Sequence, residues 1–200
     1  MAPLPQIVLA SGSPRRRELL AEAGYDFIVI PASDGAECGV CDQETPPQMV
    51  HRLALQKARD VAERLDKGLV VACDTVAAIH GRFLGKPRND DHAREMLQLL
   101  RGREHFAYSG LCVWPWPTRM PLVEVATTKL RMANLTDDQI EEYLATGLWE
   151  GKAGAFGYQD RLGWLEIVEG SESNVVGLPL ELLADLLRRQ GYEGGPLGSA

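Results

Sequence analysis

The chain has 200 residues, 45% hydrophobic and 24% charged, a composition typical of a globular protein. Its formal net charge of −7 excludes a globally basic surface for nucleic acid, so any anion site has to be local. Because the sequence lacks a long apolar run and a signal-peptide pattern, we expect a cytoplasmic protein with no membrane partner. Residues 1–193 are long enough for one domain, and residues 194–200 are predicted to form a disordered tail.

The amino-terminal stretch predicts a strand, a turn and a helix. Residues 7–10 are apolar and predict the strand, and Ser13 and Pro14 predict the N-cap and the first helical position. Arg15–Arg17 follow in the first turn, where positive charge opposes the helix dipole. Such a placement is favourable where an anion docks, so we interpret this stretch as a phosphate site. The alternative is a surface helix whose arginines point into water.

Strands and helices alternate along the rest of the chain, which predicts an α/β fold with a mixed sheet. Further strands are expected at residues 25–31, 68–72 with an extended continuation to 80, 104–116, 121–132 and 162–168. Further helices are expected at residues 46–65, 90–100, 137–145 and 179–190. Residues 147–160 contain four glycines and three aromatic residues, which indicates a loop built for close backbone approach.

Three charged residues are placed by these predicted elements. Asp74 follows the apolar run 68–72, and a carboxylate at the end of a buried strand is costly unless it is paired or binds a cation. Lys86 lies in a loop framed by glycine and proline, which lets it point into a cleft, although a solvated loop lysine is the alternative. The spacing of Lys57 by itself predicts a lysine on the surface of a helix.

Taken together, the charged residues at strand ends and in loops suggest a phosphate site with a metal. The cations are Arg15, Arg16, Lys57, Lys86 and Lys152, and the carboxylates are Glu37 and Asp74. Cations that neutralise a polyphosphate, with carboxylates for a divalent metal, are what phosphoryl or nucleotidyl chemistry requires. The Walker A, G-x-G-x-x-G and G-x-S-x-G patterns are absent, which disfavours those nucleotide-binding and hydrolase classes. Cys38 and Cys41 form one C-x-x-C without a second pair, so reduced thiols are favoured over zinc.

Short blocks along nearly the whole chain resemble the Maf family of nucleoside triphosphate pyrophosphatases. They lie at residues 9–20, 52–58, 74–76, 84–87, 96–105, 152–159 and 174–179. The resemblance implies a two-lobed α/β fold, similar to that of inosine triphosphatases, with a mixed sheet and a cleft between the lobes. It implies hydrolysis between the α and β phosphates to the monophosphate and pyrophosphate, a divalent metal cofactor (Mg or Mn) and a homodimer.

The same resemblance implies a role for individual residues. Phosphate binding is expected of Ser11, Ser13, Arg15, Arg16, Lys57 and Lys86. The catalytic residues are expected to be Asp74, Lys86 and Gln159. Asp74 would bind metal or activate the attacking water, with Glu37 as the second metal ligand or alternative base. Asp34 stays open as an alternative to Glu37 because the acidic register after the second strand is ambiguous.

Two positions distinguish the branches of the family. Asp74-Thr75 and Gly157-Tyr158-Gln159 resemble the branch that acts on dTTP and UTP, whereas the 7-methyl-GTP branch has Asp-Gln and a Glu near residue 159. The usual Gly-Ile-Gln-Gly ends in Asp160 here, and Tyr158 and Asp160 could reshape the base pocket. Two alternatives stay open: a purine house-cleaning pyrophosphatase of the inosine-triphosphate type, and a non-catalytic nucleotide-binding regulator of cell division.

Overall fold

The computed structural model of the protein describes residues 5–36, 44–160 and 162–192. Within these residues seven strands form one mixed sheet in the order β2-β1-β3-β5-β6-β7, with β4 paired to β3. The strands are β1 (Ile7–Leu9), β2 (Phe27–Val29), β3 (Gly68–Ile79), β4 (Arg82–Leu84), β5 (Glu104–Trp116), β6 (Leu122–Met132) and β7 (Leu165–Glu169). β1 is parallel to β2 and β3, and the other neighbours are antiparallel. The α/β prediction with a mixed sheet is confirmed, and the expected tail at 194–200 lies outside the described residues.

Helices cover both faces of the sheet. They are α1 (Pro14–Glu22), α2 (Pro46–Ala62), α3 (Asp90–Leu100), α4 (Asp137–Ala145), α5 (Glu172–Val176) and α6 (Leu180–Arg189). α1 and α6 share a buried apolar cluster with Leu69 and Val71 of β3, whereas α2 shares another with Val70 and Ala72. Because side chains alternate along a strand, these two clusters lie on opposite faces of the sheet.

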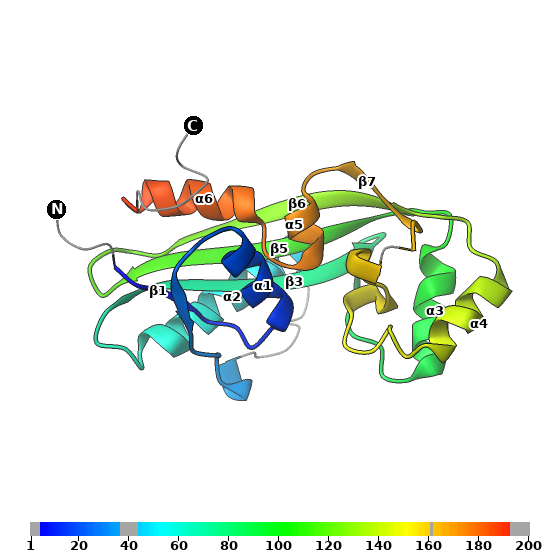
Figure 1. Ribbon diagram of the computed structural model, residues 1–200, viewed down its shortest axis with the longest axis horizontal. Helices are drawn as coiled ribbons and strands as arrows, with labels where there is room; N and C mark the ends of the chain where they lie inside the picture. The colour runs from blue at the N-terminus through cyan, green and yellow to red at the C-terminus, as the bar shows by residue number, and fades with distance from the viewer. Residues whose placement is uncertain (1–4, 37–43, 161, 193–200) are drawn as a thin grey trace.

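The second lobe is built on the far ends of the long strands β3, β5 and β6. There α3 and α4 pack together through Leu97 and Ile140, in a buried cluster that also includes Ile79 of β3 and Phe156. Figure 1 shows α1, α2 and α6 at one end of the long strands and α3 and α4 at the other. The molecule is therefore two-lobed, with one sheet common to both lobes. In the described part of the chain, no helix is both long enough and apolar enough to cross a bilayer.

Local capping explains where several helices begin. At α4 the Gln139 N–H donates to Thr136 Oγ1 (3.2 Å) and the Thr136 N–H donates to Gln139 Oε1 (2.9 Å), the reciprocal capping box that the sequence predicts. Ser13 is the N-cap of α1 as expected, but its side chain makes no capping hydrogen bond. Its backbone N–H instead donates to Ser11 Oγ (3.2 Å), so this interaction closes the turn between β1 and α1.

A glycine in β5 sets the position of α2. A Cβ atom on Gly110 would lie 2.0 Å from the carbonyl oxygen of Val50, a distance at which no side chain fits. The backbone of α2 therefore packs directly against β5. Gly110 is paired in register with Asp74 of β3, so the same close approach brings α2 next to that carboxylate.

Candidate active site

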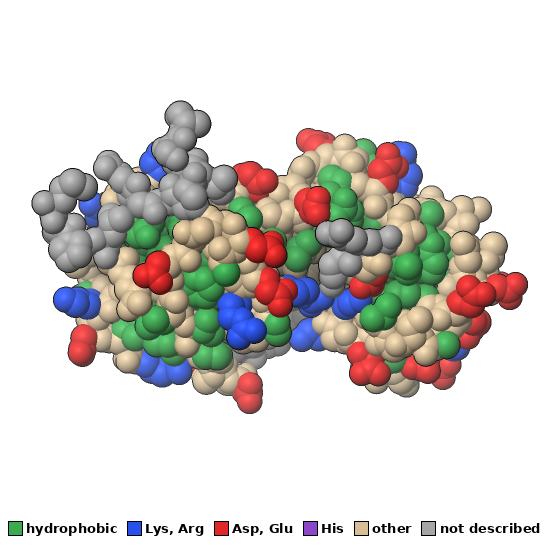
Figure 2. Space-filling view, in the orientation of Figure 1, with side chains coloured by type: hydrophobic (Ala, Val, Ile, Leu, Met, Phe, Trp, Pro, Cys, Tyr) green, Lys and Arg blue, Asp and Glu red, His purple; other side chains and the backbone are tan. Residues whose placement is uncertain are grey.

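A cleft of about 710 Å³ separates the two lobes. Its walls come from the β1–α1 turn, α2, β3, the loop after β4, the loop after α4, and α5. The described predicted site residues that line it are Ser11, Ser13, Arg15, Arg16, Lys57, Asp74, Lys86 and Lys152. Figure 2 shows Lys and Arg side chains gathered at the hollow between the two halves of the molecule. The structure thus brings together side chains from segments far apart in the sequence.

The centre of the cleft holds an ion pair. The Nζ atom of Lys57 lies 2.6 Å from Oδ1 of Asp74, and the two side chains are 10% and 14% exposed. The interpretation of Lys57 as a surface lysine is wrong. Lys57 lies one turn from both Leu53 and Val61, within the apolar stripe of α2 that faces the sheet. That spacing was the signal that could have placed it in the interior.

Asp74 lies in the middle of β3, not at the end of a strand, because β3 continues to Ile79. Among the described lining residues of the cleft, Asp74 is the one carboxylate, and no described group donates a hydrogen bond to its Oδ2. A carboxylate held through one oxygen by an ammonium group can offer the other oxygen to a water or a cation.

Arg16 is hydrogen-bonded to the protein through all three nitrogens of its guanidinium group. Nη1 donates to the Cys73 carbonyl (2.6 Å) and to Ser11 Oγ (3.3 Å). Nη2 donates to Thr75 Oγ1 (3.2 Å), and Nε donates to the Gly177 carbonyl (2.8 Å). Arg16 therefore joins the β1–α1 turn, β3 and the turn between α5 and α6.

Arg15, its neighbour, differs in its surroundings. Its side chain is half-buried and lines the cleft, and no described residue forms a hydrogen bond or ion pair with it. The exposed Arg17 does not line the cleft. Of the two arginines that line the cleft, Arg15 is the one without a described hydrogen-bond partner.

Thr75 is the hub of a small buried network behind Arg16. Its Oγ1 lies 2.8 Å from Ser109 Oγ of β5 and donates to the Gly177 carbonyl (3.3 Å). The Cys73 thiol donates to the same carbonyl (3.3 Å), and burial raises the pKa of this thiol, which keeps it protonated. Gly177 has φ +125°, a conformation that favours glycine, and this bend aims its carbonyl at all three donors.

The loop after α4 closes the cleft from the second lobe. Gly154 has φ +72°, and its N–H donates to the Gly85 carbonyl (3.1 Å), which ties this loop to the loop that carries Lys86. Lys86 is exposed and lines the cleft. The prediction of close backbone approach in residues 147–160 is confirmed by this contact.

Some residues that the sequence analysis discusses are not placed in the cleft by the structure. Glu37 and the pair Cys38 and Cys41 lie outside the described residues, as does the side chain of Gln159. Asp34, the alternative to Glu37, is exposed in the short 3₁₀ helix Asp34–Ala36 and does not line the cleft. The described residues contain no group of three or more His, Cys, Asp or Glu side chains that could hold a metal. The roles expected of Glu37 and Gln159 stay predictions.

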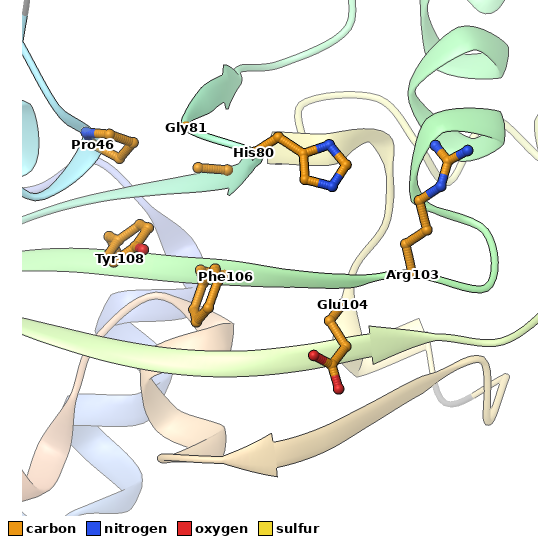
Figure 3. Close-up of a pocket in the computed structure, with 8 residues that line it drawn as sticks. Pro46, His80, Gly81, Arg103, Glu104, Phe106 and Tyr108 are labelled. Carbon is orange, nitrogen blue, oxygen red and sulfur yellow. The ribbon is translucent and has the colours of Figure 1, made fainter.

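A second cavity, of about 490 Å³, lies on the α2 side of the sheet. Its described lining comes from the end of β3 and the turn after it, from Arg103 and the start of β5, and from the first residue of α2 (Figure 3). Phe106 and Tyr108 stack along it with ring centroids 5.7 Å apart. The carboxylate among its described lining residues, Glu104, is paired with Lys129 (2.7 Å) and Arg131 (2.7 Å). Among the described lining residues of this cavity there is no expected site residue, so the cleft between the lobes is the candidate active site.

Comparisons with known proteins show what the chain is similar to. Residues 6–190 match the family described as Maf-like protein. A dTTP/UTP pyrophosphatase of Rhodopirellula baltica is 56% identical over 188 residues, which cover 93% of this chain and 83% of that protein. A dTTP/UTP pyrophosphatase of Dictyoglomus thermophilum is 42% identical over 188 residues, which cover 94% of this chain and 97% of that protein. A solved HAM1 protein from Coxiella burnetii has a TM-score of 0.52 at 16% identity, covering 93% of this chain and 100% of that one, a likeness of fold.

Proposed function

The chain belongs to the Maf-like protein family, and from that premise we propose that it hydrolyses dTTP and UTP to the monophosphate and pyrophosphate. The observation that carries the proposal is the Lys57–Asp74 pair in a cleft whose other charged lining residues, in the described chain, are all cations. A nucleoside triphosphate has the opposite charge, and the cleft volume of about 710 Å³ is in the range of small-ligand sites. The relatives named dTTP/UTP pyrophosphatase support the choice of substrate.

Two cations face the cleft without a described protein partner and are free to bind phosphate. Arg15 at the start of α1 and Lys86 in the opposite loop can contact the triphosphate from two sides. The N-terminus of α1 adds backbone N–H groups and the positive end of the helix dipole. Preplaced positive charge of this kind stabilises the negative charge that develops on departing pyrophosphate.

Asp74 is the group best placed to take a proton from the attacking water. Its Oδ1 is held by Lys57, and its Oδ2 is directed to no described donor. A general base has to lie within hydrogen-bond reach of the proton it removes, and Asp74 is the described carboxylate that lines the cleft. Lys57 in this arrangement orients the carboxylate and offsets part of its charge.

A divalent cation, Mg or Mn, belongs to the same proposal. The oxygen of a half-buried carboxylate beside a triphosphate suits Mg²⁺, which is bound by one or two carboxylates and completes its shell with phosphate oxygens and waters. Asp74 would hold the cation, with Glu37 as its expected second ligand. When bound, such a cation supplies positive charge to the phosphates and lowers the pKa of a coordinated water.

Pyrophosphate release from a panel of nucleotides tests the proposal. The purified chain would be assayed with dTTP, UTP, ITP and 7-methyl-GTP in the presence of Mg²⁺ or Mn²⁺, with the monophosphate product identified. We expect pyrophosphate from dTTP and UTP. Release from ITP but not from dTTP would instead favour the purine house-cleaning alternative, and tight nucleotide binding without release would favour the regulatory one. A homodimer and a cytoplasmic location stay predictions, and sedimentation velocity measures the first.

A further inference from the structure

Lys152 and Asp160 form a second ion pair at the edge of the cleft. Lys152 precedes the short 3₁₀ helix Ala153–Ala155, and Asp160 ends the short 3₁₀ helix Tyr158–Asp160. Lys152 Nζ contacts Asp160 Oδ1, and the two side chains are 11% and 5% exposed. The pair therefore joins two parts of the loop that closes the cleft from the second lobe.

Asp160 is fully hydrogen-bonded inside the protein. Its Oδ2 accepts from the Tyr143 hydroxyl of α4 (2.7 Å) and from the Gly157 N–H (3.2 Å). The Tyr143 ring is fixed in turn by Phe156 (centroids 5.3 Å apart) and Trp164 (5.6 Å). Burial, together with the hydrogen bond to Asp160, raises the pKa of Tyr143, so its hydroxyl remains a donor. These contacts hold the carboxylate in one position.

The two ion pairs of the cleft differ in where they place negative charge. Asp74 lines the cleft beside Lys57, whereas Lys152 lines the cleft and Asp160 does not. Asp160 therefore lies behind Lys152, away from the space that an anion would fill. A buried ammonium group without a counter-charge is costly, and a carboxylate placed behind it offsets that cost without repelling the ligand.

We propose that Lys152 binds the polyphosphate part of the ligand and that Asp160 is the residue that positions it. Lys152 is then a preformed cation on the second lobe, across the cleft from Arg15. The Gly157 N–H, held by the same carboxylate, fixes the adjoining stretch of the loop. The inference rests on the proposed function in that its ligand is a polyphosphate, but it concerns binding and not turnover.

The test is calorimetric titration with inorganic pyrophosphate in a Mg²⁺ buffer, which needs no hydrolysis. We expect Lys152→Met to weaken pyrophosphate binding about tenfold or more, the loss typical of one charge-assisted hydrogen bond. Asp160→Asn is expected to weaken binding by about five- to tenfold because the ammonium is no longer held in place. In the double variant binding should match that of Lys152→Met within about twofold, because Asp160 acts through the lysine. Lys152→Arg, which keeps the charge, should restore most of the affinity.

The control is Asp185→Asn on α6, where the carboxylate pairs with Arg188 and Arg189 outside the cleft; its binding should equal that of the wild type. If Asp160→Asn does not yield folded protein, the same comparison of single and double variants is made with Asp160→Glu, which keeps the charge and displaces the carboxylate. Unchanged or tighter pyrophosphate binding by the Asp160 variant overturns the inference. The inference is also overturned if Asp160→Asn weakens pyrophosphate binding as much in the Lys152→Met background as in the wild type, because that loss would be structural. A wild-type chain that binds pyrophosphate but does not hydrolyse dTTP or UTP contradicts the proposed function alone, and one that binds no pyrophosphate overturns this inference.

Discussion

Lys57 Nζ on α2 lies 2.6 Å from Asp74 Oδ1 on β3, in a part of the cleft where both side chains are largely buried. The contact depends on two features of the fold. Gly110 lets the backbone of α2 reach β5, and the apolar stripe of α2 turns Lys57 toward the sheet. The central ion pair is thus a consequence of how one helix packs on the sheet.

Asp74→Asn should abolish most of the proposed hydrolysis while leaving the fold intact. The amide has nearly the same shape and can still accept from Lys57, but it cannot take a proton from water. Loss of a general base typically lowers the rate by about 10²- to 10⁴-fold. Pyrophosphate release gives the rate and circular dichroism reports the fold, with Asp185→Asn on α6, outside the cleft, as the matched control. Turnover close to that of the wild type would remove Asp74 from the mechanism.

Much of this fold follows from local patterns. Continuous apolar runs mark β1 and β3, and the Thr136 capping box marks the start of α4, because each of these features reflects contacts close in sequence. The five-residue helix α5 is not among the predicted elements, since so short a helix carries no readable periodicity. It nevertheless precedes Gly177, whose carbonyl accepts from Arg16.

The site was harder to predict than the fold because its contacts are long-range. Arg16 follows a predicted N-cap, but its partners Cys73 and Gly177 become visible only once β3 and the α5–α6 turn lie beside α1. The ion pair of Lys152 and Asp160 likewise depends on how one loop folds back on α4. Charge and composition indicated a local anion site, whereas the pairing of each charge required the tertiary structure.

Gly110→Ala should destabilise the protein strongly. The new methyl group would lie 2.0 Å from the Val50 carbonyl oxygen, so α2 would have to move away from β5. Overpacking of this kind costs about 1–3 kcal/mol, and a backbone clash is at the upper end of that range. Urea denaturation measures the loss, and Gly35→Ala, where a Cβ meets nothing within 4 Å, is the control. Equal stability of the two variants would show that α2 does not pack as closely as the structure indicates.

His105 should make the protein less stable in mild acid. Burial lowers the pKa of His105 from its ordinary 6.5 to about 4, an effect that a hydrogen bond with the Arg103 backbone only partly opposes. Between these two values the unfolded chain takes up a proton that the folded protein does not, so stability falls as the pH decreases from 6.5 to 4. Linkage puts the loss from this one residue at about 2 kcal/mol by pH 5.

The measurement for His105 is the free energy of unfolding of the wild type and of His105→Gln at pH 7.5 and pH 5. The glutamine variant does not titrate, so its stability should fall less between the two pH values, whatever its stability at pH 7.5. The difference between the two pH dependences is the quantity of interest, since other titrating groups contribute equally to both proteins. Parallel losses in the two proteins would show that His105 is not the group responsible.

Arg15→Lys and Arg16→Lys should have different consequences although the residues are adjacent. Arg16 donates to four described acceptors on three segments, and lysine, with one nitrogen, cannot replace those bonds. We expect Arg16→Lys to cost about 2–3 kcal/mol of stability, since several hydrogen bonds to a charged group are lost. Arg15 has no described protein partner, so Arg15→Lys should leave the melting temperature unchanged and raise KM for dTTP. Thermal melting and steady-state kinetics on both variants separate the two roles. A stable Arg16→Lys protein with only a raised KM would instead place Arg16 with Arg15 as a direct ligand of phosphate.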